Sequence, residues 1–202
     1  FLAGHSDVVA GLAVVKDEKL ADQLYFIQNS FGAVLGIPDC WALHRGMKTL
    51  SVRMKQSSES AQVIAEFLQN HPLVEEVFYP GLATHAGHEI HLGQATSAGA
   101  VLSFRLPNKD IAKAFVENLE IPAFAVSLGA VESMLSYPAT MSHAAMRQKE
   151  REKRGITDGL LRLSVGLENC EDLVADLAQA LEIAERAVGA GTVAARTVGR
   201  FI

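Results

Sequence analysis

The chain has 202 residues, of which 49% are hydrophobic, enough for one or two globular domains with a buried core. Its 18 basic and 23 acidic residues give a net charge of -5 and are spread along the sequence, so no basic stripe indicates a nucleic-acid partner. No apolar run approaches the roughly 18 residues that span a bilayer, which argues against a membrane partner.

The two cysteines and residues 1–7 give information on the cellular location of the protein. Cys40 and Cys170 are far apart in sequence and do not suggest a disulfide framework, so reduced thiols and a cytoplasmic location are expected. The sequence begins Phe-Leu-Ala-Gly-His-Ser-Asp, without an initiator methionine, a basic n-region or a cleavage site. We therefore expect a cut chain rather than a targeted one.

The first part of the chain predicts a strand and two helices. Residues 8–15 form an apolar run typical of a buried strand, and a helix is expected over residues 18–29. After a loop, Asp39 can cap a long helix that should end near Asn70, because Pro72 cannot continue it. Its apolar positions recur at helical spacing: Met47, Leu50, Met54, Ala61, Ile64 and Leu68.

Short alternating segments follow and predict a small α+β domain whose helices cover one face of a sheet. Strands are expected over residues 100–106, 123–128 and 161–167. Asn108 and Asn169 are candidate N-caps for the helices that follow the first and the last of these strands.

The change from long helices to short segments suggests three parts. Residues 1–70 are expected to form one part and residues 71–188 a second, α+β domain. Residues 189–202 have no helical periodicity and are expected to be mobile or to dock irregularly.

Arg162 is the strongest candidate for a binding residue. In Leu-Arg-Leu-Ser-Val-Gly-Leu, residues 161–167, a period of two places the arginine on the face opposite the leucines. A guanidinium within an apolar strand needs an anion, and its planar fork matches a substrate carboxylate. The alternative is a structural ion pair with an internal aspartate or glutamate.

Two further motifs carry weaker signals. Ser127 lies where an expected strand ends at Gly129, so its hydroxyl and nearby amides could face a ligand, although a serine before a glycine is often only a turn. His85, His88 and His91 recur three apart, but Gly87 makes a regular helix doubtful and no second ligand cluster follows. A solvated loop is favoured there over a metal site.

Five motifs in order resemble one family, the pyridoxal-phosphate-dependent enzymes of cysteine and methionine metabolism. They are Phe-Leu-Ala-Gly-His-Ser-Asp at 1–7, His-Arg-Gly-Met-Lys-Thr-Leu at 44–50, Ser-Leu-Gly-Ala-Val-Glu-Ser at 127–133, Tyr-Pro-Ala-Thr-Met-Ser-His at 137–143 and Arg-Leu-Ser-Val-Gly-Leu-Glu at 162–168. The resemblance covers residues 1–188. It implies an α/β fold-type I PLP-dependent transferase, with residues 1–70 at the end of the large α/β/α domain and the α+β carboxyl-terminal domain after them.

The resemblance also implies the site and its cofactor, pyridoxal 5'-phosphate. Arg162 matches the arginine that binds the substrate α-carboxylate, and Ser127 matches a serine beside it. The Schiff-base lysine is expected immediately before Phe1, so no catalytic residue is assigned within this chain. A homotetramer is the assembly that the family suggests.

The kind of elimination depends on Val126. Relatives that use γ-chemistry often carry a glutamate there, which can pair with the distal ammonium of cystathionine, whereas valine offers no charge. Together with the segments at 28–33 and 38–41, this favours β-elimination of cystathionine to homocysteine, pyruvate and ammonia. The alternatives are γ-elimination or γ-replacement and, in another class, an inert structural piece that lacks the cofactor lysine.

Overall fold

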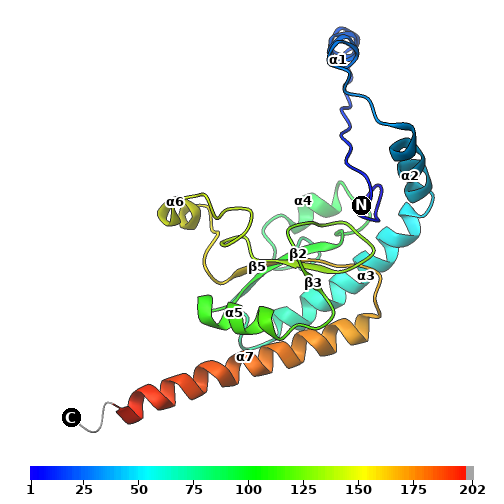
Figure 1. Cartoon of the computed structure of the whole chain (residues 1–202). Helices are drawn as coiled ribbons and strands as arrows, with labels where there is room; N and C mark the ends of the chain where they lie inside the picture. The colour runs from blue at the N-terminus through cyan, green and yellow to red at the C-terminus, as the bar shows by residue number, and fades with distance from the viewer. Residues whose placement is uncertain (199–202) are drawn as a thin grey trace. The chain divides into compact units, whose positions relative to one another are not determined.

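The computed structural model describes residues 1–198, and from residue 188 onward it describes the backbone only. The chain forms two compact units, Phe1–Leu50 and Ser51–Ile202 (Figure 1). Among the described residues, no helix combines the length and the apolarity needed to cross a bilayer.

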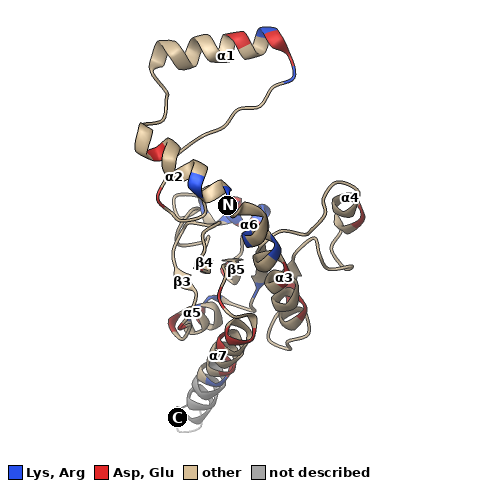
Figure 2. Ribbon diagram, turned by 90° about the vertical axis from the view of Figure 1, so that its right-hand side faces the viewer, with Lys and Arg blue, Asp and Glu red and all other residues tan. Residues whose placement is uncertain are grey.

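In the first unit, the helix expected over residues 18–29 is confirmed as α1, Glu18–Phe31. It begins at Asp17, whose carboxylate accepts the Leu20 N–H at 2.8 Å, and it ends at Gly32, whose φ of 70° suits a glycine C-cap. Figure 2 shows that its charged residues gather at its first turns, and no residue of α1 is buried. Apart from the half-buried Leu24, the apolar side chains of α1 therefore remain exposed in this unit.

The buried strand expected over residues 8–15 is wrong for this chain. The segment forms no strand, and Val9 is 95% exposed. An extended segment becomes a strand only when a neighbouring strand takes up its backbone N–H and C=O groups. None of the described residues pairs with it.

The single helix expected from Asp39 to Asn70 is instead two helices, α2 (Ile37–Met47) and α3 (Leu50–Gln69). The first begins after Gly36, so Asp39 lies in its first turn and is not its cap. The break comes where the N–H groups of Lys48 and Thr49 each bond a carbonyl three residues back, which tightens and ends the last turn. Apolar periodicity does not detect such a break, because the apolar positions continue beyond it.

Two of the quoted motifs meet inside the first unit. A Cβ at Gly46, in α2, would lie 2.1 Å from the carbonyl oxygen of Ala3. The backbone of the first residues therefore packs directly on α2, and only glycine leaves room for it.

The second unit is built on a five-stranded sheet in the order β1-β2-β5-β4-β3, in which only the β3–β4 pair is parallel. The strands are β1 (Glu76–Phe78), β2 (Val101–Arg105), β3 (Ala123–Phe124), β4 (Met134–Ser136) and β5 (Leu160–Ser164). The expected strands at 100–106 and 161–167 match β2 and β5, although β5 stops at Ser164. The strand expected over 123–128 has only two residues. β1 and β4 are too short for a pattern to reveal.

Helices α3, α5 (Lys109–Glu117) and α7 (Cys170–Val198) contribute to one core with the sheet, as the expected α+β domain requires (Figure 1). Asn108 accepts two backbone N–H groups at the start of α5, and Asn169 does the same at α7, so both expected N-caps are confirmed. Phe104 of β2 and Phe115 of α5 meet edge to face with ring centroids 5.7 Å apart. Burial of each large side chain contributes about 1.5 to 3 kcal/mol.

The expected part boundaries differ from the observed ones. Ala61, Ile64 and Leu68 of α3 belong to the same core as the sheet, and the second unit begins at Ser51, at the start of this helix. The change from long helical patterns to short segments near Asn70 marks the end of α3 and not a boundary between the two units. At the other end, α7 continues to Val198, so residues 189–198 are helical and not irregular; the remaining four residues of the expected tail lie outside the described residues.

Candidate substrate-carboxylate site

Strand β5 separates the core of the second unit from a polar face. Leu161 and Leu163 are fully buried in the core and pair with the core residues of β2 and β4. The alternation of a strand then turns Arg162 and Ser164 to the opposite face. The face assignment made from sequence is therefore confirmed.

On that face Arg162 lies between two serines. Ser103 of β2 and Ser136 of β4 are its direct partners in the strand register. Side chains opposite each other in a register are about 4.5 to 5.5 Å apart at Cβ. The arginine therefore has short polar neighbours on both sides and no acidic neighbour in its row.

The guanidinium of Arg162 is held by main-chain oxygens. Its Nη2 donates to the carbonyl of Val126 at 2.9 Å and to that of Ser127 at 3.1 Å. Its Nε is buried and has no hydrogen-bond partner among the described residues. A buried, charged donor without a partner is costly, and a ligand oxygen would relieve that cost.

A second arginine on the same sheet face shows what an internal ion pair looks like here. Arg105 of β2 binds the carboxylate of Glu76 at 3.1 Å and lies 5.3 Å from the ring centroid of Phe78. Among the described residues Arg162 has no such acidic partner. The contrast disfavours the structural ion pair that the sequence left open for Arg162.

Ser127 and Val126 meet Arg162 through their backbones. Both side chains belong to exposed residues, and Val126 is 62% exposed. The sequence analysis placed Val126 and Ser127 at the site through their side chains. In the structure their carbonyl oxygens contact Arg162. Every residue has a backbone carbonyl, so the residue type does not indicate which carbonyl will accept a hydrogen bond.

The loop that carries these carbonyls is tied to the end of β5. Ser133 is almost fully buried, and its N–H and Oγ donate to the two carboxylate oxygens of Glu168 at 2.6 and 2.8 Å. The Gly166 N–H donates to the same Oγ at 2.8 Å, and the Leu167 N–H donates to Val131 O at 2.8 Å. Two motifs that lie about 35 residues apart therefore form one hydrogen-bonded unit.

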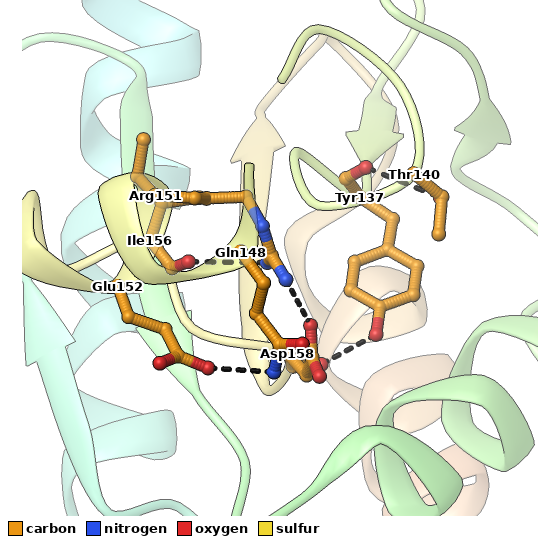
Figure 3. Close-up of polar contacts among 7 residues, drawn as sticks. All are labelled: Tyr137, Thr140, Gln148, Arg151, Glu152, Ile156 and Asp158. Carbon is orange, nitrogen blue, oxygen red and sulfur yellow. Dashed lines mark hydrogen bonds and ion pairs between the residues drawn. The ribbon is translucent and has the colours of Figure 1, made fainter. Parts of the chain in front are cut away.

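A second polar network, which the sequence did not reveal, anchors the Tyr-Pro-Ala-Thr motif (Figure 3). The buried Arg151 of α6 (Gln148–Lys153) binds the carboxylate of Asp158 at 2.5 Å and donates to Ile156 O at 3.1 Å. The Tyr137 hydroxyl donates to Asp158 O. Burial and the nearby Asp158 carboxylate raise the pKa of Tyr137, so this phenol remains a neutral donor.

The histidines at 85, 88 and 91 contact separate backbone groups. The residues after Gly87 form a short helix, α4 (His88–Leu92), where a loop was expected. The Nδ1 of His88 contacts Pro80 O at 2.7 Å, and the Nε2 of His91 contacts Ser97 O at 2.8 Å. Within residues 1–198 no group of three or more histidine, cysteine, aspartate or glutamate residues is placed to hold a metal ion.

The lysines of the chain do not fit the role of a cofactor attachment point. Every one is exposed: Lys16, Lys19, Lys48, Lys55, Lys109, Lys113, Lys149 and Lys153. An amine that condenses with a cofactor aldehyde must be held in a pocket that binds the cofactor, and none of these exposed lysines is so enclosed. The described residues therefore suit a substrate carboxylate and not the covalent attachment of pyridoxal phosphate.

Comparison with known proteins agrees with the motifs. The profile of the Cys/Met metabolism PLP-dependent enzyme family matches residues 1–182. Cystathionine beta-lyase MetC of Bacillus subtilis is 65% identical over 182 residues, which are 90% of this chain and 47% of that protein. Cystathionine gamma-lyase of the same organism is 48% identical over 90% of this chain and 48% of its own length.

Solved structures give the same result at the level of the fold. Cystathionine gamma synthase from Xanthomonas oryzae pv. oryzae superimposes with a TM-score of 0.88 and 44% identity, over 92% of this chain and 48% of that one. Cystathionine gamma-lyase from Lactobacillus plantarum superimposes with a TM-score of 0.87 and 40% identity, over 91% and 48%. The chain spans about half the length of these relatives. By its motifs, its sheet and these matches, the chain belongs to the Cys/Met metabolism PLP-dependent enzyme family.

Proposed function

We propose that the whole protein is a carbon-sulfur lyase that uses pyridoxal phosphate to cleave cystathionine by β-elimination, giving homocysteine, pyruvate and ammonia. One observation carries the proposal: Arg162 lies on the polar face of the sheet and, unlike Arg105, has no acidic partner among the described residues, while its buried Nε, like that of Arg105, makes no hydrogen bond. Such a donor suits the α-carboxylate that every amino-acid substrate of this family carries. The 65% identity to a cystathionine beta-lyase supports the choice of bond.

In this proposal the chain provides binding and orientation. Arg162 fixes the α-carboxylate of the substrate. A fixed carboxylate limits rotation about the Cα–N bond, so that the Cα proton faces the catalytic base. Ser127 lies beside it, and Val126 leaves the distal ammonium of cystathionine without an anionic partner. When bound, pyridoxal phosphate supplies an electron sink for the charge that develops at Cα.

Residues outside the chain are assigned the remaining roles. We place the attachment lysine immediately before Phe1, as the resemblance implies, and Phe1–Leu50 in the large cofactor domain. The exposed lysines of this chain support that placement, because none of them is suited to the chemistry. A homotetramer and a cytoplasmic location complete the proposal; the free cysteines Cys40 and Cys170 are consistent with a reducing compartment.

The test is to supply L-cystathionine to the full-length protein and to identify the keto acid by chromatography. Pyruvate as the dominant product supports β-elimination. The second candidate is γ-elimination, which the 48% identity to a cystathionine gamma-lyase favours. Dominant 2-oxobutanoate would replace the proposal by that candidate, and the absence of either keto acid would reject both.

A further inference from the structure

The polar face of β5 meets the loop of residues 126–133 at alternate positions. Arg162 donates to the carbonyls of Val126 and Ser127, and Ser164 accepts from Gly129. The next alternate residue, Gly166, has no Cβ, and the backbone of residues 131–133 occupies that space. The loop therefore runs along the strand, and each contact fixes the part of the loop opposite it.

Ser164 makes the central contact. It is fully buried, and its Oγ accepts the Gly129 N–H at 2.9 Å. Gly129 has a φ of +79°, a left-handed conformation that L side chains rarely adopt. A hydrogen bond to a residue at such a turn holds the chain direction on both sides of it.

The carbonyls that accept from Arg162 lie between two hydrogen bonds that fix the loop, which we call ties. On one side the Ala125 N–H donates to Leu135 O at 3.0 Å, and on the other side Gly129 is bound to Ser164. Only residues 126–128 separate the two. Loss of either tie therefore frees the two peptide groups whose oxygens set the direction of the guanidinium.

We propose that Ser164 is a positioning residue for the carboxylate site of Arg162. By holding Gly129 it fixes the Val126 and Ser127 carbonyls, which in turn hold Nη2 and direct the remaining guanidinium donors toward the substrate. The inference rests on the proposed function and adds a residue that never touches substrate. Its effect reaches the substrate only through the loop and Arg162.

The experiment compares Ser164→Ala with Tyr79→Phe in the full-length protein. Tyr79 is a matched control, because it is also fully buried and its hydroxyl makes one hydrogen bond to backbone, 2.8 Å to Gly99 O, which is not part of the loop at residues 126–133. Loss of one hydrogen bond corresponds to about a tenfold change in an equilibrium constant. We expect Ser164→Ala to raise KM for cystathionine about tenfold with a smaller change in kcat, and Tyr79→Phe to leave KM unchanged.

A double-variant cycle separates positioning from general damage. If Ser164 acts through Arg162, Ser164→Ala has no further effect on KM once Arg162→Ala is present. Equal effects of Ser164→Ala in both backgrounds would overturn the inference. So would an unchanged KM in the single variant.

Solvent exchange of the Arg162 side chain can be measured without catalysis, so it tests the role of Ser164 independently of the proposed function. The Arg162 Nε–H signal in 15N NMR, assigned by its loss in Arg162→Lys, reports how firmly the guanidinium is held. We expect faster solvent exchange of this proton in Ser164→Ala than in wild type or Tyr79→Phe. If the protein cleaves no cystathionine but this exchange accelerates, the proposed function fails and the positioning holds; unchanged exchange rejects the positioning.

Discussion

The backbone of Gly166 lies against Ser133 with no space for a side chain. The Gly166 N–H donates to Ser133 Oγ at 2.8 Å, while a Cβ built on Gly166 would lie 2.5 Å from the Ser133 nitrogen and 2.3 Å from Val131 O. These obstacles are backbone atoms, which cannot turn aside as a flexible side chain can. The loop beside Arg162 therefore depends on a glycine at this position.

We predict that Gly166→Ala destabilises the second unit. The loop must move away from β5 and lose hydrogen bonds of Ser133, at a cost of about 2 to 4 kcal/mol. Gly11→Ala is the control, because a Cβ there meets nothing within 4 Å. Urea unfolding followed by circular dichroism measures both; equal midpoints for the two variants would contradict the prediction.

Replacement of Arg162 should weaken substrate binding selectively. Arg162→Ala in the full-length protein is expected to cost about 2 to 5 kcal/mol in binding of an amino-acid substrate, because it leaves a carboxylate without its charged partner. The absorbance of the bound cofactor should remain. Arg105→Ala is the matched control, since Arg105 lies on the same sheet face but already has Glu76 as its partner. Unchanged steady-state parameters for Arg162→Ala would show that this arginine is structural.

The sequence predicted the parts that follow from periodicity and from caps. The alternation around Arg162 located its strand and its face, and Asn108 and Asn169 located two helix starts. The contacts of Arg162 with main-chain oxygens could not be predicted, because every residue type carries a carbonyl and those of Val126 and Ser127 have no signature in the sequence. The strand expected over residues 8–15 failed for a related reason: an apolar run indicates burial, but burial needs a partner surface.

A buried phenol gives the second unit a specific alkaline response. Tyr79 is fully buried, its hydroxyl donates to Gly99 O at 2.8 Å, and burial raises its pKa from 10.0 to about 12. Between these values the unfolded chain has released the proton while the folded chain still holds it. The stability contributed by this group is therefore complete below pH 10 and is lost as the pH rises toward about 12, by about 2 to 3 kcal/mol.

Tyr79→Phe isolates this effect from other alkaline titrations. The variant should be less stable than wild type near neutral pH by about 1 kcal/mol, because Gly99 O loses its donor. The difference between the two proteins should shrink as the pH rises above 10 and reverse before pH 12, since only wild type carries the phenol and loses more stability than the hydrogen bond contributes. Urea unfolding at a series of pH values provides the measurement, and a constant difference would show that the pKa of Tyr79 is not raised.

The 202-residue chain alone should not attach pyridoxal phosphate at a defined position. All its lysines are exposed, so no pocket favours one amine over another. After incubation with the cofactor and borohydride reduction, mass spectrometry of peptides should find only scattered, substoichiometric labels. One stoichiometric label on a single lysine would show that the attachment site has been placed wrongly.

The last prediction concerns Val126 and the choice of bond. In the proposed mode the distal ammonium of cystathionine finds no anion at this position, whose side chain belongs to an exposed residue close to Arg162. A glutamate there would add a charge that can pair with that ammonium and so favour the pose in which the γ-carbon carries the leaving group. Val126→Glu in the full-length protein should therefore raise the ratio of 2-oxobutanoate to pyruvate. Val126→Gln, which has the same length and no charge, should leave the ratio near that of wild type. Equal ratios in the two variants would show that the charge at this position does not select the bond.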